Sequence, residues 1–143
     1  MTKLVSILIL SLSVFQLTAQ QIPIPDEHFE KALVDKGIDD KVDGLLDLTK
    51  ANTVDSLNIS MLQIHDLTGI EAFTNIEVLN CSHNLLRQLD LSKNTKLKVL
   101  KCGNYIDYMY EGDEYNPELG NLISELAFSN NSALEYIGAD MIS

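Results

Sequence analysis

The sequence predicts an α/β solenoid, in which short parallel strands alternate with irregular return segments behind an N-terminal helical cap. The first observation is a recurring pattern, apolar-x-x-Leu-x-(Leu/Cys/Ile), whose leucine falls at Leu57, Leu79 and Leu100, in steps of 22 and 21 residues. The second is an offset series, in which the stretch from Leu86 matches the stretch from Ile123, 37 residues later. The third is a helix-like segment ahead of the repeats. Units of this length stack because one unit alone cannot bury its apolar edge.

Residues 1–20 are expected to be a removable signal peptide. A positive start at Lys3 is followed by an almost purely apolar stretch from Leu4 to Leu17, and then by small and polar residues. This stretch has the length of a secretory signal and is short for a membrane span. With cleavage near Ala19, the chain is secreted, exposed at the cell surface or periplasmic, and it does not span the membrane. A retained membrane anchor is the alternative.

Residues 21–50 are expected to form the helical cap. Asp26 suits the N-cap position of a helix, Glu27 suits its first turn, and Gly37 suits its C-terminal stop. Three apolar residues share one face at helical spacing: Phe29, Ala32 and Leu33. We expect this face to cover the first apolar edge of the repeats.

A calcium site in this cap is the alternative to a solvated acidic turn. Three carboxylates crowd the turn before Gly44: Asp39, Asp40 and Asp43. A calcium loop places oxygen ligands at alternate positions and an acid at the twelfth. Lys41 takes the third position and Lys50 the twelfth, so the pattern favours the solvated turn and no metal.

Residues 51–143 are expected to form the solenoid, with an insertion at 105–121. Residues two apart in a strand point the same way, so Leu79 and Cys81 face the core while Val78 and Asn80 face outward. Three asparagines fall where the chain turns, and their side chains can satisfy backbone groups that a bend leaves unpaired: Asn84, Asn94 and Asn131.

The two cysteines occupy the same inward position on neighbouring repeats. Cys81 and Cys102 lie in an exported chain, where an even number of cysteines often indicates a disulfide. Strands about 4.8 Å apart fall within disulfide range, but the two side chains would run parallel. The pattern therefore favours free, buried thiols, with a disulfide as the alternative.

Two surfaces are candidate binding sites. Four of the five tyrosines fall in the insertion, beside several carboxylates: Tyr105, Tyr108, Tyr110 and Tyr115. Tyrosine-rich loops often recognise partners, although these rings could instead pack against the flank of the repeats. The second candidate is the outward side of the strands, with Ser56, Val78, Val99 and Tyr136 in one column and Asn58, Asn80 and Lys101 in the next.

At this point the chain resembles a family. Its segments IPDEHFEKALVDKGID, DLTGIEAFTNIEVLNCSHN and LDLSKNTKLKVLKCGN are similar to exported leucine-rich-repeat proteins of Bacteroidetes type, which have internalin-like repeats and a helical N-terminal cap. The resemblance implies a curved leucine-rich-repeat solenoid and a recognition or adhesion role, without catalytic residues. Two positions depart from the repeat, because Leu62 and Tyr105 stand where asparagine is expected. The C-terminal sorting domain of many relatives is also missing.

Charge and motif content narrow the function. The formal net charge of −11 disfavours nucleic acid, whose binding needs positive charge. Neither an activated nucleophile motif nor a phosphate-binding glycine loop appears, and the three histidines are far apart in the sequence. We expect a non-enzymatic module without a cofactor that binds a protein or glycan partner. The alternative is a structural or truncated repeat array, without its own ligand, that needs a neighbouring chain at its C-terminal edge.

Overall fold

The computed structural model describes residues 21–104 and 120–138, and the predicted signal peptide lies outside them. Within these ranges no helix is long and apolar enough to cross a membrane. The elements, in chain order, are β1 (Gln21–Pro23), α1 (Glu27–Asp35), β2 (Leu45–Asp47), α2 (Leu48–Ala51), β3 (Ser56–Asn58), a 3-10 helix (Ile70–Ala72), β4 (Val78–Asn80), β5 (Gln88–Asp90), β6 (Val99–Lys101), β7 (Glu125–Ala127) and β8 (Tyr136–Gly138).

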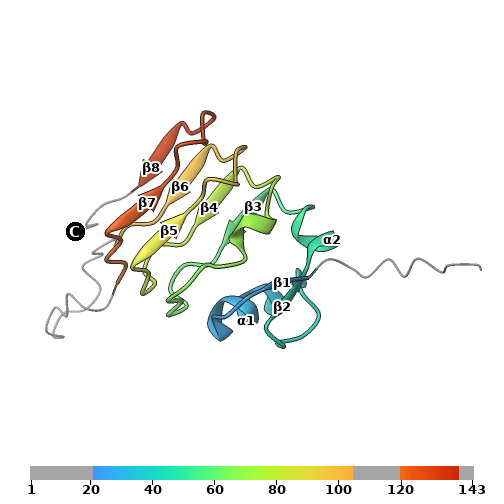
Figure 1. Cartoon of the computed structure of the whole chain (residues 1–143). Helices are drawn as coiled ribbons and strands as arrows, with labels where there is room; N and C mark the ends of the chain where they lie inside the picture. Colours follow the sequence, from blue (N-terminus) through green and yellow to red (C-terminus); the bar gives the residue numbers. More distant parts are fainter. Residues whose placement is uncertain (1–20, 105–119, 139–143) are drawn as a thin grey trace, which may run out of the picture.

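Four of the strands form one parallel sheet in the order β3-β4-β6-β8 (Figure 1). Leu57 pairs with Leu79, Leu79 with Leu100, and Leu100 with Ile137. The chain therefore returns to the same sheet after 22, 21 and 37 residues. This is the register that the sequence repeats predict, and it is confirmed.

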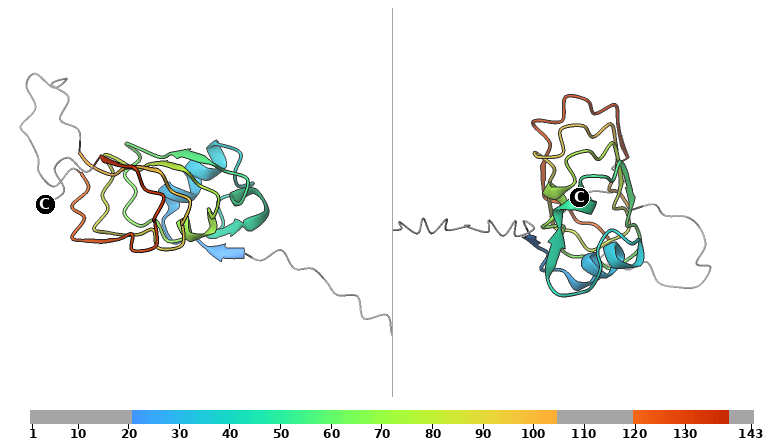
Figure 2. Two further views of the ribbon diagram at one scale, coloured as in Figure 1. Left: turned by 90° about the horizontal axis from the view of Figure 1, so that it is seen from above. Right: turned by 90° about the vertical axis from the view of Figure 1, so that its right-hand side faces the viewer.

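A second parallel sheet lies in the return segments. Strands β5 and β7 pair in parallel, with Leu89 opposite Leu126, so the 37-residue offset between the two stretches is confirmed. The return segments were expected to be irregular throughout, and this is wrong for the part that forms β5 and β7. The reason is local: Leu89 and Leu91 alternate with polar residues just as strand residues do. Figure 1 shows strands of the two sheets alternating along the molecule, and Figure 2 shows successive repeats one behind another.

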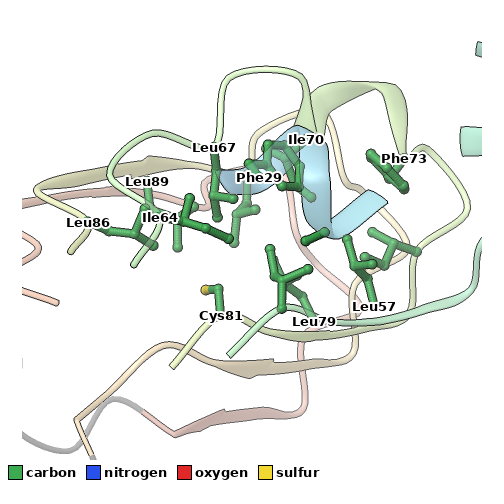
Figure 3. Packing of buried hydrophobic residues seen from close by; sticks show 14 of the residues in the cluster. Phe29, Leu57, Ile64, Leu67, Ile70, Phe73, Leu79, Cys81, Leu86 and Leu89 are labelled. Carbon is green, nitrogen blue, oxygen red and sulfur yellow. The ribbon is translucent and has the colours of Figure 1, made fainter. Parts of the chain in front are cut away.

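The core runs between the two sheets. The inward leucines of the first three strands, Leu57, Leu79 and Leu100, are at most 1% exposed. Cys81 and Cys102 are fully buried beside them, and both thiols are free, as predicted (Figure 3 shows Cys81 below the cluster). They act as small apolar residues in a close-packed core.

The buried thiols are expected to make stability depend on pH. Burial raises the pKa of both, and that of Cys102 goes from 9.0 to about 11. A folded-state pKa above the unfolded one gives stability that is complete below pH 9 and is lost as the pH rises toward 11. Between pH 8 and 11 the raised pKa of Cys102 alone should lower the free energy of unfolding by about 2 kcal/mol. The pKa of Cys81 is raised too, so the reduced wild-type chain should lose more than about 2 kcal/mol relative to the double variant Cys81→Ala, Cys102→Ala. Urea unfolding at each pH measures this, and parallel pH profiles for the two proteins would contradict it.

Helix α1 lies at the N-terminal end of the repeats, and its Phe29 belongs to the same buried cluster as Leu67 and Ile70 (Figure 3). Asp26 is its N-cap, as predicted, because Oδ1 accepts the backbone N–H of Phe29 at 2.9 Å. The second oxygen, Oδ2, accepts the backbone N–H groups of His65 and Asp66 at 2.8 and 3.1 Å. One carboxylate thus starts the helix and ties it to the first return segment.

The acidic turn after α1 is exposed at Asp40 and Asp43, as the sequence predicts, but not at Asp39. Asp39 is only 7% exposed, and its Oδ1 accepts the backbone N–H of Asp40 at 2.8 Å. Burial raises the pKa of this carboxyl group, and the nearby Glu30 adds to the effect. Around it the lysines form ion pairs, Lys41 with Asp43 at 2.5 Å and Lys50 with Asp40. The turn is held against α1 by Glu30, whose Oε1 accepts the backbone N–H groups of Asp43, Gly44 and Leu45.

The predicted role of the turn asparagines is confirmed. Asn84 is buried and donates Nδ2 to the carbonyls of Ile59 and Cys81, at 2.8 and 3.0 Å. Its Oδ1 accepts the backbone N–H of Leu62 at 3.0 Å, so the turn that lacks its own asparagine is satisfied from the next repeat. Asn94 and Asn131 each donate Nδ2 to two carbonyls of the repeat before them.

Candidate functional site

The outward side of the four-stranded sheet, called the strand face below, carries the predicted columns. Parallel register places Ser56, Val78, Val99 and Tyr136 in one row and Asn58, Asn80, Lys101 and Gly138 in the next. Val78 is 36% exposed and Tyr136 is 52% exposed. All seven residues that the sequence proposes for this surface therefore lie together on it.

The strand face differs in charge from the rest of the chain. The sequence contains 21 Asp and Glu against 10 Lys and Arg, yet none of the eight outward residues of these strands is acidic. The single charged residue among them is Lys101. It forms no ion pair or hydrogen bond within residues 21–104 and 120–138, whereas Lys98, just before the same strand, pairs with Glu77 at 2.7 Å.

The second column presents hydrogen-bond donors. Asn58 Oδ1 accepts from the backbone N–H and the hydroxyl of Ser60, at 3.2 and 2.8 Å. Asn80 Oδ1 accepts from the backbone N–H of Ser82 at 3.2 Å. Because the oxygens face the backbone, the Nδ2 groups are left to donate outward. With the Lys101 ammonium they form a row of donors, which we call the donor strip (Asn58, Asn80, Lys101).

A shallow depression of about 340 Å³ lies over the donor strip at its β8 end, between Asn80, Lys101 and Tyr136. The Tyr136 ring lies across Gly138, two residues further along the same strand. A Cβ atom at position 138 would come within 3.1 Å of Cε1 and Oη of that ring. Glycine at this position thus lets the aromatic ring lie low over the strand and form one wall of the depression.

The tyrosine-rich insertion was the other predicted site. Tyr105, Tyr108, Tyr110 and Tyr115 lie outside the described residues, but the base of the insertion is described. Asn121 donates its backbone N–H to Asn104 Oδ1 at 2.7 Å, and Asn104 donates Nδ2 to the Asn121 carbonyl at 2.8 Å. The insertion therefore leaves and rejoins the fold just beyond the end of β6.

Asn121 also supplies the asparagine that the repeat lacks at position 105. It is fully buried, donates Nδ2 to the carbonyls of Cys81 and Cys102, and accepts the backbone N–H of Leu86. The sequence reading missed this role. The signal was present, because the same 37-residue offset that aligns the later repeats also aligns Asn84 with Asn121.

A second hollow, of about 630 Å³, lies along β5 and β7 and was not predicted. Its lining is acidic where the strand face is not: Asp66, Glu71, Asp90 and Glu125, with Lys93. Two of these carboxylates accept hydrogen bonds from residues that follow them in the chain. Asp66 Oδ1 accepts from the Thr68 backbone and hydroxyl at 2.8 Å, and a similar bond from Ser92 lowers the pKa of Asp90. Asp66 and Asp90 are therefore turn-forming groups.

The described residues offer little for metal or acid–base chemistry. No group of three or more His, Cys, Asp or Glu among them is placed to hold a metal ion. His28 and His65 are exposed on α1 and on the first return segment, and His83 lies at the edge of the strand face.

The fold is similar to that of bacterial proteins of known structure. The functional domain of InlJ from Listeria monocytogenes, which includes a cysteine ladder, matches with a TM-score of 0.59 and 24% identity over 82% of this chain and 23% of that one. An internalin, InlF, from the same species matches with a TM-score of 0.54 and 18% identity over 85% of this chain and 46% of that one. At these identities the likeness concerns the fold: internalin-like, with leucine-rich repeats and mixed α/β content.

A third match has a higher identity over a shorter part. The CBM51-2 and INT domains of ZmpB from Clostridium perfringens, in complex with GlcNAc, match with 32% identity and a TM-score of 0.49 over 59% of this chain and 18% of that one. The present chain thus spans less than half the length of each of these three proteins. Neither a protein-family profile nor a curated protein matches the sequence.

Proposed function

We propose that this chain is an exported, non-enzymatic binding module: a leucine-rich-repeat solenoid whose strand face receives a protein or glycan partner. One observation carries the proposal. The strand face groups Val78, Val99 and Tyr136, partly or largely exposed, beside the donors of Asn80 and Lys101. An exposed aromatic and apolar group next to well-placed polar residues is typical of recognition surfaces. The internalin-like fold supports it, because rigid strands hold such side chains in fixed positions.

The rest of the proposal concerns place and partner. The apolar stretch in residues 1–20 supports export, and hence a secreted, cell-surface or periplasmic protein. The net charge of −11 disfavours a nucleic-acid partner, because the phosphates of nucleic acid bind to positive charge. The tyrosine-rich insertion, which follows Asn104 in the sequence, is the second candidate surface for such a partner.

The test is a comparison of two surfaces of one protein. We expect the double variant Val99→Ser, Tyr136→Ala to lose at least tenfold in affinity for the natural partner, as substitutions in the centre of an interface do. The matched control is Gln88→Ala, Glu125→Ala, on the second sheet, which should bind as the wild type does. Binding is measured by interferometry against fractions of an envelope or host extract, with circular dichroism as the check on folding. Equal losses in both variants would contradict the proposal.

A second candidate function rests on the exposure of the last repeat. Ile137 is 39% exposed where Leu100 is fully buried, and Phe128 is 40% exposed where Leu91 is fully buried. A structural repeat array without its own ligand, covered there by a neighbouring chain, would bury these side chains. Sedimentation separates the two candidates, because a monomer at micromolar concentration contradicts the neighbouring-chain version.

A further inference from the structure

The donor strip selects for ligands rich in acceptors. Its side chains offer two amide Nδ2 groups and one ammonium, while the oxygens of Asn58 and Asn80 are bonded to the turns that follow their strands. A carboxylate brings only acceptors, and its hydrogen bonds to an ammonium group are among the stronger ones in proteins.

Tyr136 adds a flat apolar surface at one end of the strip. Its ring lies across Gly138, which is the register partner of Lys101 on the neighbouring strand. The face of an aromatic ring carries negative charge density and attracts the positive edges of C–H groups. The C–H face of a sugar ring is such a partner. The Tyr136 ring and the Lys101 ammonium can therefore contact the apolar C–H face and the carboxylate of one small ligand.

From this we infer that the strand face binds a carboxylate-bearing saccharide, with a uronate residue stacked on Tyr136 and its carboxylate on Lys101 and Asn80. The inference rests on the proposed function and names its ligand class. The depression of about 340 Å³ has the volume of a small-molecule site, at the lower end of the usual range of about 300–1,000 Å³. It suits one or two sugar rings.

This surface is less suitable for binding an acidic peptide. Peptide anchors gain most of their affinity by filling apolar pockets in the centre of an interface. Val78 and Val99 lie side by side on adjacent strands and offer a shallow surface to such an anchor. The Tyr136 ring, in contrast, is 52% exposed, and a sugar ring can stack on it whereas a peptide carboxylate does not.

The acidity of the whole chain does not prevent the binding of an anion here. The outward positions of the four strands contain no carboxylate, so no like charge lies within the strip itself. At about 0.15 M salt the Debye length is about 8 Å, and carboxylates on the second sheet are screened. The short-range attraction between the anion and the Lys101 ammonium then outweighs the repulsion from the rest of the chain.

The experiment compares one saccharide with and without its charge. Trigalacturonate and its methyl ester share a carbohydrate skeleton, but the ester masks every carboxylate. We expect isothermal titration of the full chain to show binding of trigalacturonate, at least tenfold weaker binding of the ester, and a similar loss in Lys101→Gln. The matched control Lys93→Gln removes a lysine from the hollow beside the second sheet and should leave the binding of both saccharides unchanged. Gly138→Val displaces the Tyr136 ring and should weaken both saccharides, since stacking does not depend on charge.

Each other outcome overturns the inference in a distinguishable way. If the ester binds as tightly as the acid and Gly138→Val weakens both, the strand face binds sugars and the acidic class is wrong. If an oligoglutamate peptide binds through Lys101 and trigalacturonate does not, the face is a binding site for a different class. If trigalacturonate shows no binding, or binds equally in Lys101→Gln and wild type, the saccharide proposal fails, while the proposed function is judged separately by Val99→Ser, Tyr136→Ala.

Discussion

Replacing Asn121 by alanine should lower the free energy of unfolding by about 4 kcal/mol. The side chain is fully buried and bonds three backbone groups: the carbonyls of Cys81 and Cys102, at 2.9 and 2.8 Å, and the N–H of Leu86, at 3.1 Å. Alanine leaves the Cys102 carbonyl and the Leu86 N–H buried and unpaired, at a cost of about 1–3 kcal/mol each, while the Cys81 carbonyl keeps its bond from Asn84. Because small domains are stable by about 5–15 kcal/mol, this loss brings the fold near its limit. Urea denaturation followed by circular dichroism measures it.

A matched substitution and a deletion sharpen this prediction. Asn130→Ala removes an exposed asparagine with one long bond, 3.3 Å, to the Ser92 carbonyl, and should cost less than about 0.5 kcal/mol. Deleting residues 105–120 joins Asn104 to Asn121 and recreates the sequence order of the preceding repeat, in which Asn84 follows Cys81 by three residues. We expect this variant to unfold within about 1 kcal/mol of the wild type. A deletion as damaging as Asn121→Ala would show that the insertion supports the repeats.

The repeats could be predicted because their physics is periodic. Leu57, Leu79 and Leu100 recur at a spacing that lets neighbouring strands pair in register, and nothing outside the repeat is needed to place them. The pairing of β1 with β2 was not predictable in this way. It joins Gln21–Pro23 to Leu45–Asp47 in an antiparallel pair, across a helix and an acidic turn, and no periodic signal links the two segments.

The sequence predicted which residues share the strand face, but not which of their polar atoms are free to bind a ligand. Alternation along each strand is enough to place Asn80 and Lys101 on one surface. The direction in which Asn80 points its oxygen depends on the turn after β4, where the backbone N–H of Ser82 takes it. The position of the Tyr136 ring depends on the missing side chain of Gly138. Both are three-dimensional contacts between residues whose types allow several other arrangements.

The structure of the acidic turn could not be predicted from the sequence either, because it depends on Glu30 of α1. Glu30 occupies α1 at only 2% exposure, and its Oε1 accepts the backbone N–H groups of Asp43, Gly44 and Leu45, at 2.8, 2.6 and 3.1 Å. In sequence Glu30 is one of several charged helix residues, and nothing indicates that it faces inward. Its three bonds hold the turn against the helix and position β2 for pairing with β1.

We therefore expect Glu30→Ala to lower the free energy of unfolding by about 3 kcal/mol, because hydrogen bonds to a charged group contribute about 1.5–3 kcal/mol each and removal of the buried charge offsets part of that loss. Glu30→Gln keeps an acceptor and removes the repulsion between Glu30 and Asp39, so it should cost about half as much. The control is Asp35→Ala on the same helix. Its exposed pair with Lys31 at 3.0 Å should contribute less than about 1 kcal/mol.

Hydrogen exchange of the Asp43–Leu45 amides locates the effect: it should accelerate in Glu30→Ala and stay unchanged in Asp35→Ala. Equal exchange in the two variants would show that the turn is held by its lysine pairs and not by Glu30.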